Sequence, residues 1–151
     1  MSLVDKIDEK YKISIKEKDN NSINTLRLIK SSIKDKEIAL RSKQEKLLDK
    51  DILSLLQNMI KQRKDSIEAF AKANRNDLIE KEKNEVLVIE KFLPQQLSEG
   101  EAQKIIAKII QENNLSSLKD MGKLMSIIKK NYVGQIDMGV AGKIAKSSLG
   151  N

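Results

Sequence analysis

The stretch DILSLLQNMIKQRKDSIEAFAKA, from Asp51 to Ala73, decides the fold. Its apolar residues return every three or four positions, which is the period of an amphipathic α-helix. They are Ile52, Leu55, Leu56, Met59, Ile60, Ile67 and Phe70. A polar turn at Gln62–Lys64 interrupts the stripe, and Asn74, which tolerates the left-handed conformation, follows its end. The stretch predicts a long helix that buries one face.

Three further helices are predicted in the N-terminal part of the chain, each from an apolar stripe at helical spacing. Their expected ranges are about 3–19, 22–40 and 75–93. The polar stretch Arg41–Lys50 reads as a loop, and Asp49 or Asp51 is expected to cap the helix after it. Pro94 ends the fourth helix, because proline lacks a backbone donor and disfavours helix at the residue before it.

Beyond Pro94 the pattern changes to short helices, expected at about 98–113, 117–130 and 137–149. Ser98 with Glu101 has the spacing of a capping box, and Ser117 with Asp120 repeats it. No alternating strand pattern occurs. The sequence therefore predicts an all-α fold, with an N-terminal bundle of about four helices in residues 1–94 joined at Pro94 to a small three-helix domain in residues 95–151.

Residue types that the chain lacks exclude several kinds of catalytic and metal-binding site. The chain has no cysteine and no histidine, so it lacks a thiolate nucleophile and the commonest metal ligand. We expect no metal site and no cofactor. Glu80, Glu82 and Glu85 could offer carboxylate chemistry, but they stand in a charged run that we expect to be solvated. No catalytic residue is predicted.

The compartment follows from similar reasoning. No apolar stretch is long enough to cross a bilayer, so no membrane partner is expected. The first residues, MSLVDKIDEKYK, contain acids in place of the apolar core of a secretory signal. Ser2-Leu3 is compatible with native residues or with a cloning scar. With no targeting pattern, a cytoplasmic protein is predicted.

The net charge of +7 has two interpretations. Only four of the 29 basic residues are arginine, which is typical of compositional drift toward lysine without any polyanionic partner. The excess is nevertheless concentrated toward the end of the chain, because residues 121–151 contain five lysines against one acid, Asp137. Such a segment could bind a polyanion.

Several motifs resemble one protein family over nearly the full length. They are TLR at 25–27, IKQRKDSIE at 60–68, FAKA at 70–73, RNDL at 75–78, FLPQQLS at 92–98 and KDMGKLM at 119–125. With these the chain resembles the GatB/YqeY family, small helical proteins similar to the tail of the B subunit of glutamine-dependent tRNA amidotransferase. Two positions depart from the family pattern. Asn74 stands in place of a usual glycine, and Gln135 replaces a basic residue that would offer a phosphate contact.

The resemblance implies an RNA-facing surface in the C-terminal part, since the similar amidotransferase tail contacts tRNA. Its candidate residues are Lys123, Lys129, Lys130, Gly134, Lys143 and Lys146. Lysines would act as point charges and glycines would permit close approach of a phosphate backbone. The alternative is that Gly122, Gly139 and Gly142 only let the short helices pack closely, with the lysines solvated.

A weaker candidate is a basic strip on the second and third helices. Its residues are Arg27, Lys30, Lys34, Lys61, Arg63 and Lys64. Acids close in sequence, at positions 35, 37, 65 and 68, could pair with these cations and cancel their field. We expect Arg27 and Arg63 to be structural, in contact with carboxylates of neighbouring helices.

Three functions remain open at this point. The favoured one is a non-catalytic module that binds tRNA, with tRNA and an amidotransferase or another translation protein as partners. The second is a component of a carbon–nitrogen ligase that uses glutamine as amide donor, although the catalytic parts of such an enzyme need several hundred residues in the family. The third is a protein–protein adaptor that binds through the N-terminal helices.

Overall fold

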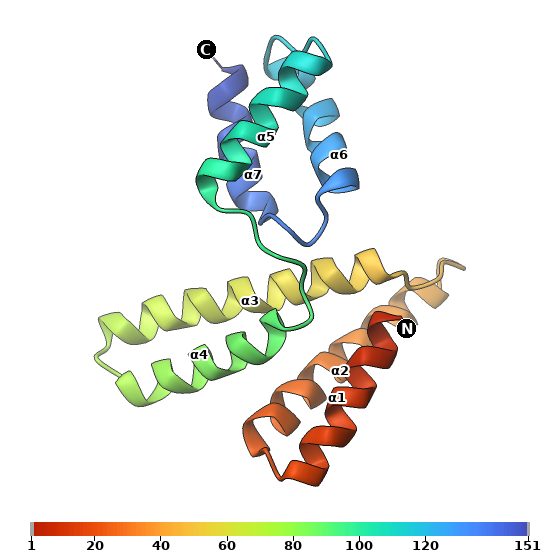
Figure 1. Ribbon diagram of the computed structural model, residues 1–151, viewed down its shortest axis with the longest axis vertical. Helices are drawn as coiled ribbons and strands as arrows, with labels where there is room; N and C mark the ends of the chain where they lie inside the picture. The colour runs from red at the N-terminus through yellow and green to blue at the C-terminus, as the bar shows by residue number, and fades with distance from the viewer. Residues whose placement is uncertain (1, 151) are drawn as a thin grey trace. The chain divides into compact units, whose positions relative to one another are not determined.

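The computed structural model describes residues 2–150, which form seven α-helices and one short 3₁₀-helix without any strand (Figure 1). The all-helical prediction is confirmed. The chain divides into two compact units, the first ending at Leu93 and the second beginning at Pro94. Each unit has a hydrophobic core of its own. That each unit folds alone, as a domain should, stays a prediction.

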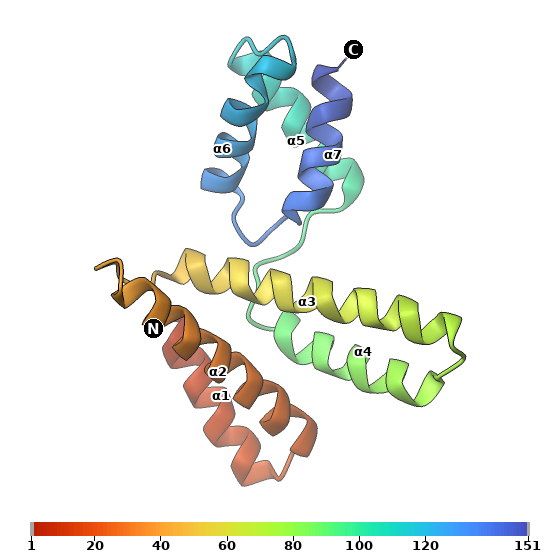
Figure 2. The same cartoon turned by 180° about the vertical axis from the view of Figure 1, so that it is seen from behind.

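The first unit consists of two helical hairpins. Its helices are α1 (Leu3–Glu17), α2 (Asn20–Arg41), α3 (Asp49–Lys72) and α4 (Asn76–Glu90). Helices α1 and α2 lie side by side, as do α3 and α4, and both views show the turns of the two hairpins far apart (Figures 1 and 2). The predicted compact four-helix bundle is not confirmed, because α3 and α4 continue past α1 and α2 as a two-helix arm.

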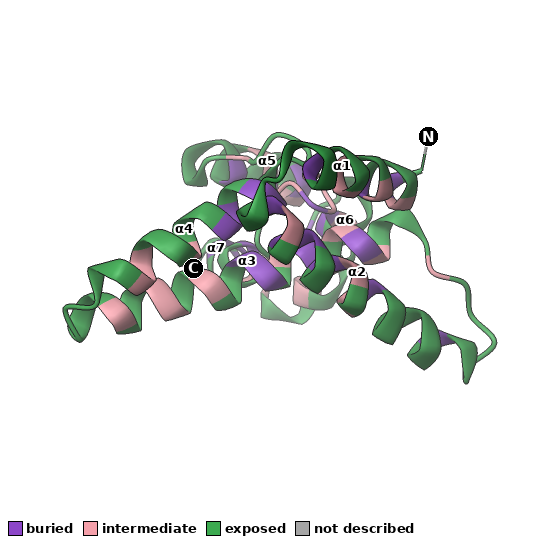
Figure 3. Cartoon of the chain, turned by 90° about the horizontal axis from the view of Figure 1, so that it is seen from below, coloured by how far each residue is buried: buried purple, intermediate pink, exposed green. Residues whose placement is uncertain are grey.

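Burial in the first unit stops part of the way along α3 and α4. The buried core contains Leu3, Ile7, Leu26, Ile29, Ile33, Ile52, Leu56, Met59, Ile60, Val86, Val88 and Ile89. No residue between positions 61 and 84 is buried, and the outer end of the arm is coloured only as intermediate or exposed (Figure 3). Ile67 and Phe70, predicted to be buried, are therefore only half-buried.

Local signals set the helix ends of the first unit. Lys18 is left-handed with φ of 58°, and Asp19 caps α2 by accepting from the Ser22 backbone N–H at 3.2 Å. The turn between α1 and α2 thus lies two residues earlier in the chain than predicted. Asn74 has φ of 57°, which confirms its left-handed conformation. The residue that precedes α3 is Leu48 and not the expected Asp49 or Asp51; Asp51 lies in the first turn, where its carboxylate accepts from the Leu48 N–H at 2.8 Å.

The second unit contains α5 (Glu99–Glu112), the 3₁₀-helix η1 (Leu118–Asp120), α6 (Met121–Asn131) and α7 (Met138–Leu149). Ser98 Oγ accepts from the Glu101 N–H at 3.2 Å and the Glu101 carboxylate accepts from the Ser98 N–H at 3.4 Å, so the predicted capping box forms. Leu118 lies at the start of the range predicted as one helix, 117–130, but it belongs to η1 and is 51% exposed. Helix α6 begins only at Met121.

Candidate nucleic-acid interface

All five lysines predicted for an RNA-facing surface are exposed on α6 and α7. They are Lys123, Lys129, Lys130, Lys143 and Lys146. Within residues 2–150 none of them lies within 4 Å of a carboxylate oxygen. Asp137, the one acid in this segment, accepts from the Gly139 N–H at 2.9 Å and caps α7. Among residues 2–150, no ion pair therefore neutralises the positive charge of these two helices.

The positions of the lysines follow from the faces that the two helices bury. Helix α6 turns Leu124 and Ile128 into the core, so Lys123 and Lys130, seven residues apart, share one exposed side. Helix α7 buries Ala141, Ile144, Ala145 and Leu149. Lys143 and Lys146, three residues apart, lie together on its outer face. In the last turn of α6, lysines are also favourable for the helix, because their charge opposes the negative end of its dipole.

Gly134 does not join these lysines. It is buried in the turn between α6 and α7, with φ of 80°, a conformation that favours glycine. Its carbonyl oxygen accepts from the Gln96 side-chain amide, and the Gln135 carbonyl accepts from the Leu97 N–H at 2.8 Å. These bonds fasten the start of the second unit to the turn. Gly134 is thus a structural residue, and its prediction as a phosphate contact is corrected.

The other glycines of the segment do not serve close packing between helices. A Cβ atom added at Gly122 or at Gly142 would meet no atom within 4 Å, and at Gly139 it would meet only the carboxylate of Asp137, at 3.4 Å. The alternative that these glycines let the short helices approach one another is therefore wrong. They leave bare helix backbone beside Lys123 and Lys143, although an exposed helical glycine costs about 0.5–1 kcal/mol relative to alanine.

Three of the six cations of the weaker basic strip, Arg63, Lys30 and Arg27, make contacts inside the first unit. Arg63 Nε lies 2.8 Å from Glu85 Oε2, with the two side chains only 11% and 12% exposed, and Arg63 Nη1 donates to the Met59 carbonyl at 3.1 Å. The expected contact of Arg63 with a carboxylate of a neighbouring helix is confirmed. Glu85 was expected to be solvated; it is buried, because α4 turns it toward α3.

Two more cations of the strip face α1. Lys30 Nζ lies 3.0 Å from Asp8 Oδ1 and 4.6 Å from the centre of the Tyr11 ring. Arg27 Nε donates to the Tyr11 hydroxyl at 3.0 Å, so Arg27 contacts a phenol and not the expected carboxylate. The exposed members without an ion pair in the described part of the chain are Arg27, Lys34, Lys61 and Lys64, and of these the three lysines also make no side-chain hydrogen bond there.

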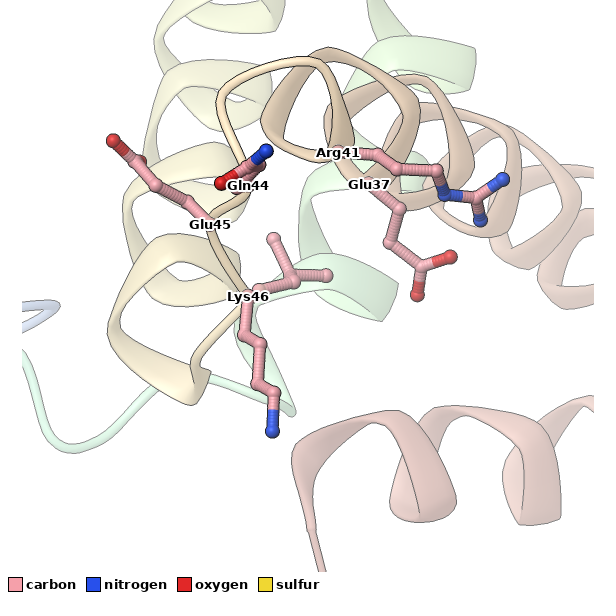
Figure 4. Close-up of a pocket in the computed structure, with 6 residues that line it drawn as sticks. Glu37, Arg41, Gln44, Glu45 and Lys46 are labelled. Atoms are coloured by element: carbon pink, nitrogen blue, oxygen red, sulfur yellow. The ribbon is translucent and has the colours of Figure 1, made fainter.

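A shallow hollow of about 410 Å³ lies where α2 ends, but it offers no defined chemistry (Figure 4). Its lining residues are Glu37, Arg41, Gln44, Glu45, Lys46 and Leu47. In the close-up Glu37 and Arg41 extend to the same side, whereas Glu45 and Lys46 point away from them. Over residues 2–150 no three metal-ligating side chains come together, and no helix there is long and apolar enough to cross a membrane.

The chain is similar in sequence to one family model and to several known proteins. The model of a family described as "Yqey-like protein" matches residues 4–149. A protein of Lachancea thermotolerans named "Altered inheritance of mitochondria protein 41, mitochondrial" is 38% identical over 113 residues, which are 70% of this chain and 59% of that protein. The protein of the same name from Kluyveromyces lactis is 37% identical over 121 residues, 80% of this chain and 61% of that one. The chain thus matches about six tenths of these relatives.

The names of these relatives correct one prediction. Both are named as mitochondrial proteins, as is the relative in Saccharomyces cerevisiae, which is 32% identical over 122 residues. This finding contradicts the cytoplasmic location expected from the sequence. That expectation depended on the composition of the first residues alone, which does not determine the compartment.

Proposed function

The chain belongs to the YqeY-like protein family, and we propose that it is a non-catalytic helical module that binds tRNA through α6 and α7. The observation that carries the proposal is the set of five exposed lysines on these helices, which have no ion pair within residues 2–150. A phosphate backbone is the polyanion that would supply the missing negative charge.

The type of contact follows from what accompanies the lysines. Gly122 and Gly142 leave open space beside the helix backbone, which would allow a phosphate to approach closely. The aromatic residue of the segment, Tyr132, is half-buried and packs against the core of the second unit, which disfavours stacking of its ring on bases. The proposed mode is therefore recognition of backbone phosphates and shape, without reading of base sequence.

Partner proteins belong to the same proposal. An amidotransferase or another protein of translation would share the tRNA with this module. A second function, as a protein–protein adaptor, is favoured by one observation, the half-buried apolar residues along the α3–α4 arm. These are Ile67, Phe70, Leu78 and Ile79.

A titration of labelled bulk tRNA at several salt concentrations tests the proposal. If each of the five lysines neutralises one phosphate, the logarithm of the binding constant should fall against the logarithm of salt with a slope of about −3.5 to −4.5. Between roughly 50 and 200 mM salt, this corresponds to a loss of about two orders of magnitude or more. The absence of measurable affinity at low salt would exclude the proposed function.

Two further assays distinguish the alternatives. Purified protein should neither release ammonia from glutamine nor consume ATP, with or without an added amidase subunit; turnover in either assay would favour the carbon–nitrogen ligase. A pull-down that recovers one protein partner, unaffected by salt and nuclease, would favour the adaptor.

A further inference from the structure

The α3–α4 hairpin is buried very unevenly along its length. At its inner end Leu56 and Ile89 are completely buried, and Met59, Ile60, Val86 and Val88 belong to the same core. Outside this region, from Lys64 to Asn84, not one residue is buried (Figure 3). The outer half of the hairpin therefore removes much less apolar surface from water than the inner half.

Polar contacts show the same division. The outermost described hydrogen bond from α2 to α4 joins Asn21 Nδ2 to the Asn84 carbonyl at 3.5 Å. Farther out, the described side-chain contacts are local: Ser66 Oγ donates to the Gln62 carbonyl within α3, and Arg75 pairs with Asp77 two residues away. Both partners of the latter pair are more than half exposed. Such contacts add little to holding the arm against the rest of the unit.

Between the two halves lies the Arg63–Glu85 ion pair. On the inner side, Ile60, one helical turn before Arg63, and Val86, the residue after Glu85, are buried. On the outer side, the adjacent residues Lys64 and Asn84 are exposed. The 2.8 Å contact joins α3 to α4, and the second arm of the guanidinium is held by the Met59 carbonyl. Separating such a pair leaves two charges in poorly solvated positions, which is costly.

We propose that residues 64–84 open as a separate segment while the rest of the first unit stays folded, and that the Arg63–Glu85 pair sets the inner limit of this opening. The opened segment exposes the apolar seam of the arm, from Ile67 and Phe70 on α3 to Leu78 and Ile79 on α4. The inference concerns the first unit alone and does not depend on tRNA binding by the second.

Hydrogen exchange on the full chain, read amide by amide by NMR, tests the first part. Amide hydrogens in regions that open locally exchange through openings of low free energy, whereas those of the core exchange only when the whole unit unfolds. Helical amides of residues 64–84 should exchange at least about tenfold faster than those around Leu56 and Ile89. Equal rates in the two regions, with equal sensitivity to low urea, would show a single cooperative unit and overturn the proposal.

Glu85→Gln tests the second part, with Glu80→Gln as its matched control. Glu80 is exposed on the same helix, so its change should leave the exchange pattern unaltered. In Glu85→Gln the fast region should extend inward over residues 59–63 and 85–86. If circular dichroism shows that this variant has lost its fold, Arg63→Lys, which keeps the charge but not the forked contact, replaces it. An unmoved boundary in the folded variant would refute the role of the pair.

Discussion

At the scale of single residues, Ser14 is an internal polar group left without a partner. Its side chain is completely buried between α1 and α2, and within residues 2–150 its Oγ is the buried side-chain oxygen or nitrogen that makes no hydrogen bond. A buried hydroxyl without a partner keeps its full desolvation cost. Ser14→Ala should therefore raise the free energy of unfolding, by up to about 1 kcal/mol. Urea denaturation monitored by circular dichroism measures it.

Thr25 provides the matched comparison for Ser14. It is also completely buried in this hairpin, but its hydroxyl donates to the Asn21 carbonyl at 2.9 Å. Thr25→Val should lower the free energy of unfolding by about 1 kcal/mol, since it removes a satisfied hydrogen bond. A loss of stability in Ser14→Ala as large as that in Thr25→Val would contradict the assignment of Ser14.

Asp120 makes the stability of the second unit depend on pH. Its carboxylate accepts from the backbone N–H of Ser116 at 2.8 Å and of Ser117 at 3.3 Å, and these bonds, aided by nearby Lys123, hold the pKa of Asp120 below its ordinary value of 3.8. A depressed pKa stabilises the fold above the unfolded-state value, and this contribution is lost as the pH falls through the folded-state pKa.

The expected result is a difference between the native chain and Asp120→Asn that depends on pH. The native chain should be the more stable above about pH 4, and the difference should shrink steadily as the medium becomes more acidic. Urea unfolding at several pH values checks the trend. A constant difference across the acid range would mean that the Asp120 carboxylate is not held by these bonds.

At the scale of the helices, the sequence predicted whatever depends on neighbours along the chain. Apolar periods located the helices, Ser98 and Glu101 formed the predicted cap, and Asn74 took the predicted left-handed conformation. Burial was less predictable. Leu118 has helical spacing but lies in a short 3₁₀ turn, and Glu85 lies in a charged run yet faces α3. Those outcomes depend on which helix packs against which, and spacing does not encode that.

The two candidate sites also differ in how far the sequence alone could predict them. The α6 and α7 lysines were predicted as a candidate RNA-facing surface from the local excess of lysine over acid and from the family resemblance, and the structure shows them exposed. For Lys30, acids on its own helix were the expected partners, but α1 supplies Asp8 instead. An ion pair between helices forms only if the helices pack so that the two partners meet. Which cations of the N-terminal basic strip are paired could therefore not be predicted from the sequence alone.

Gly122, which is exposed, and Gly142, which is half-buried, offer a test at this scale. Gly122→Ala and Gly142→Ala should each raise the free energy of unfolding by about 0.5–1 kcal/mol, because alanine is the better helix former and its methyl group meets open space. If bare backbone faces the phosphates, the same changes should weaken tRNA binding while they strengthen the fold.

Gly134→Ala is the control for these two variants. Its φ of 80° is unfavourable for any residue with a Cβ, so this change should destabilise the second unit by roughly 1–2 kcal/mol. Thermal unfolding distinguishes the three variants. A destabilised Gly142→Ala would contradict the open surroundings of that residue.

At the scale of the whole molecule, the two cores do not share a residue. Every residue of the first core precedes Pro94 and every residue of the second follows it. Fragments 1–93 and 94–151 should each unfold cooperatively, and calorimetry of the full chain should show two transitions that match those of the fragments. A fragment that is unfolded alone would mean that its core needs the other unit.

The central claim is that the lysines of α6 and α7, and not the overall charge, bind tRNA. The decisive measurement compares the affinity of two variants for bulk tRNA at low salt. One has Lys123, Lys129 and Lys130 replaced by Glu, and the control has Lys34, Lys61 and Lys64 replaced by Glu. Each reversal changes the charge by two, so both variants fall from +7 to +1.

Both variants must first give the circular dichroism of the native chain, because Lys129 and Lys130 also stabilise the last turn of α6 through the helix dipole, although all the substituted residues are exposed. We predict that the α6 variant loses tRNA affinity by about two orders of magnitude or more and flattens the salt dependence, while the control loses much less. Equal losses in the two variants would mean that binding follows net charge alone, and this would contradict the assignment of the interface to α6 and α7.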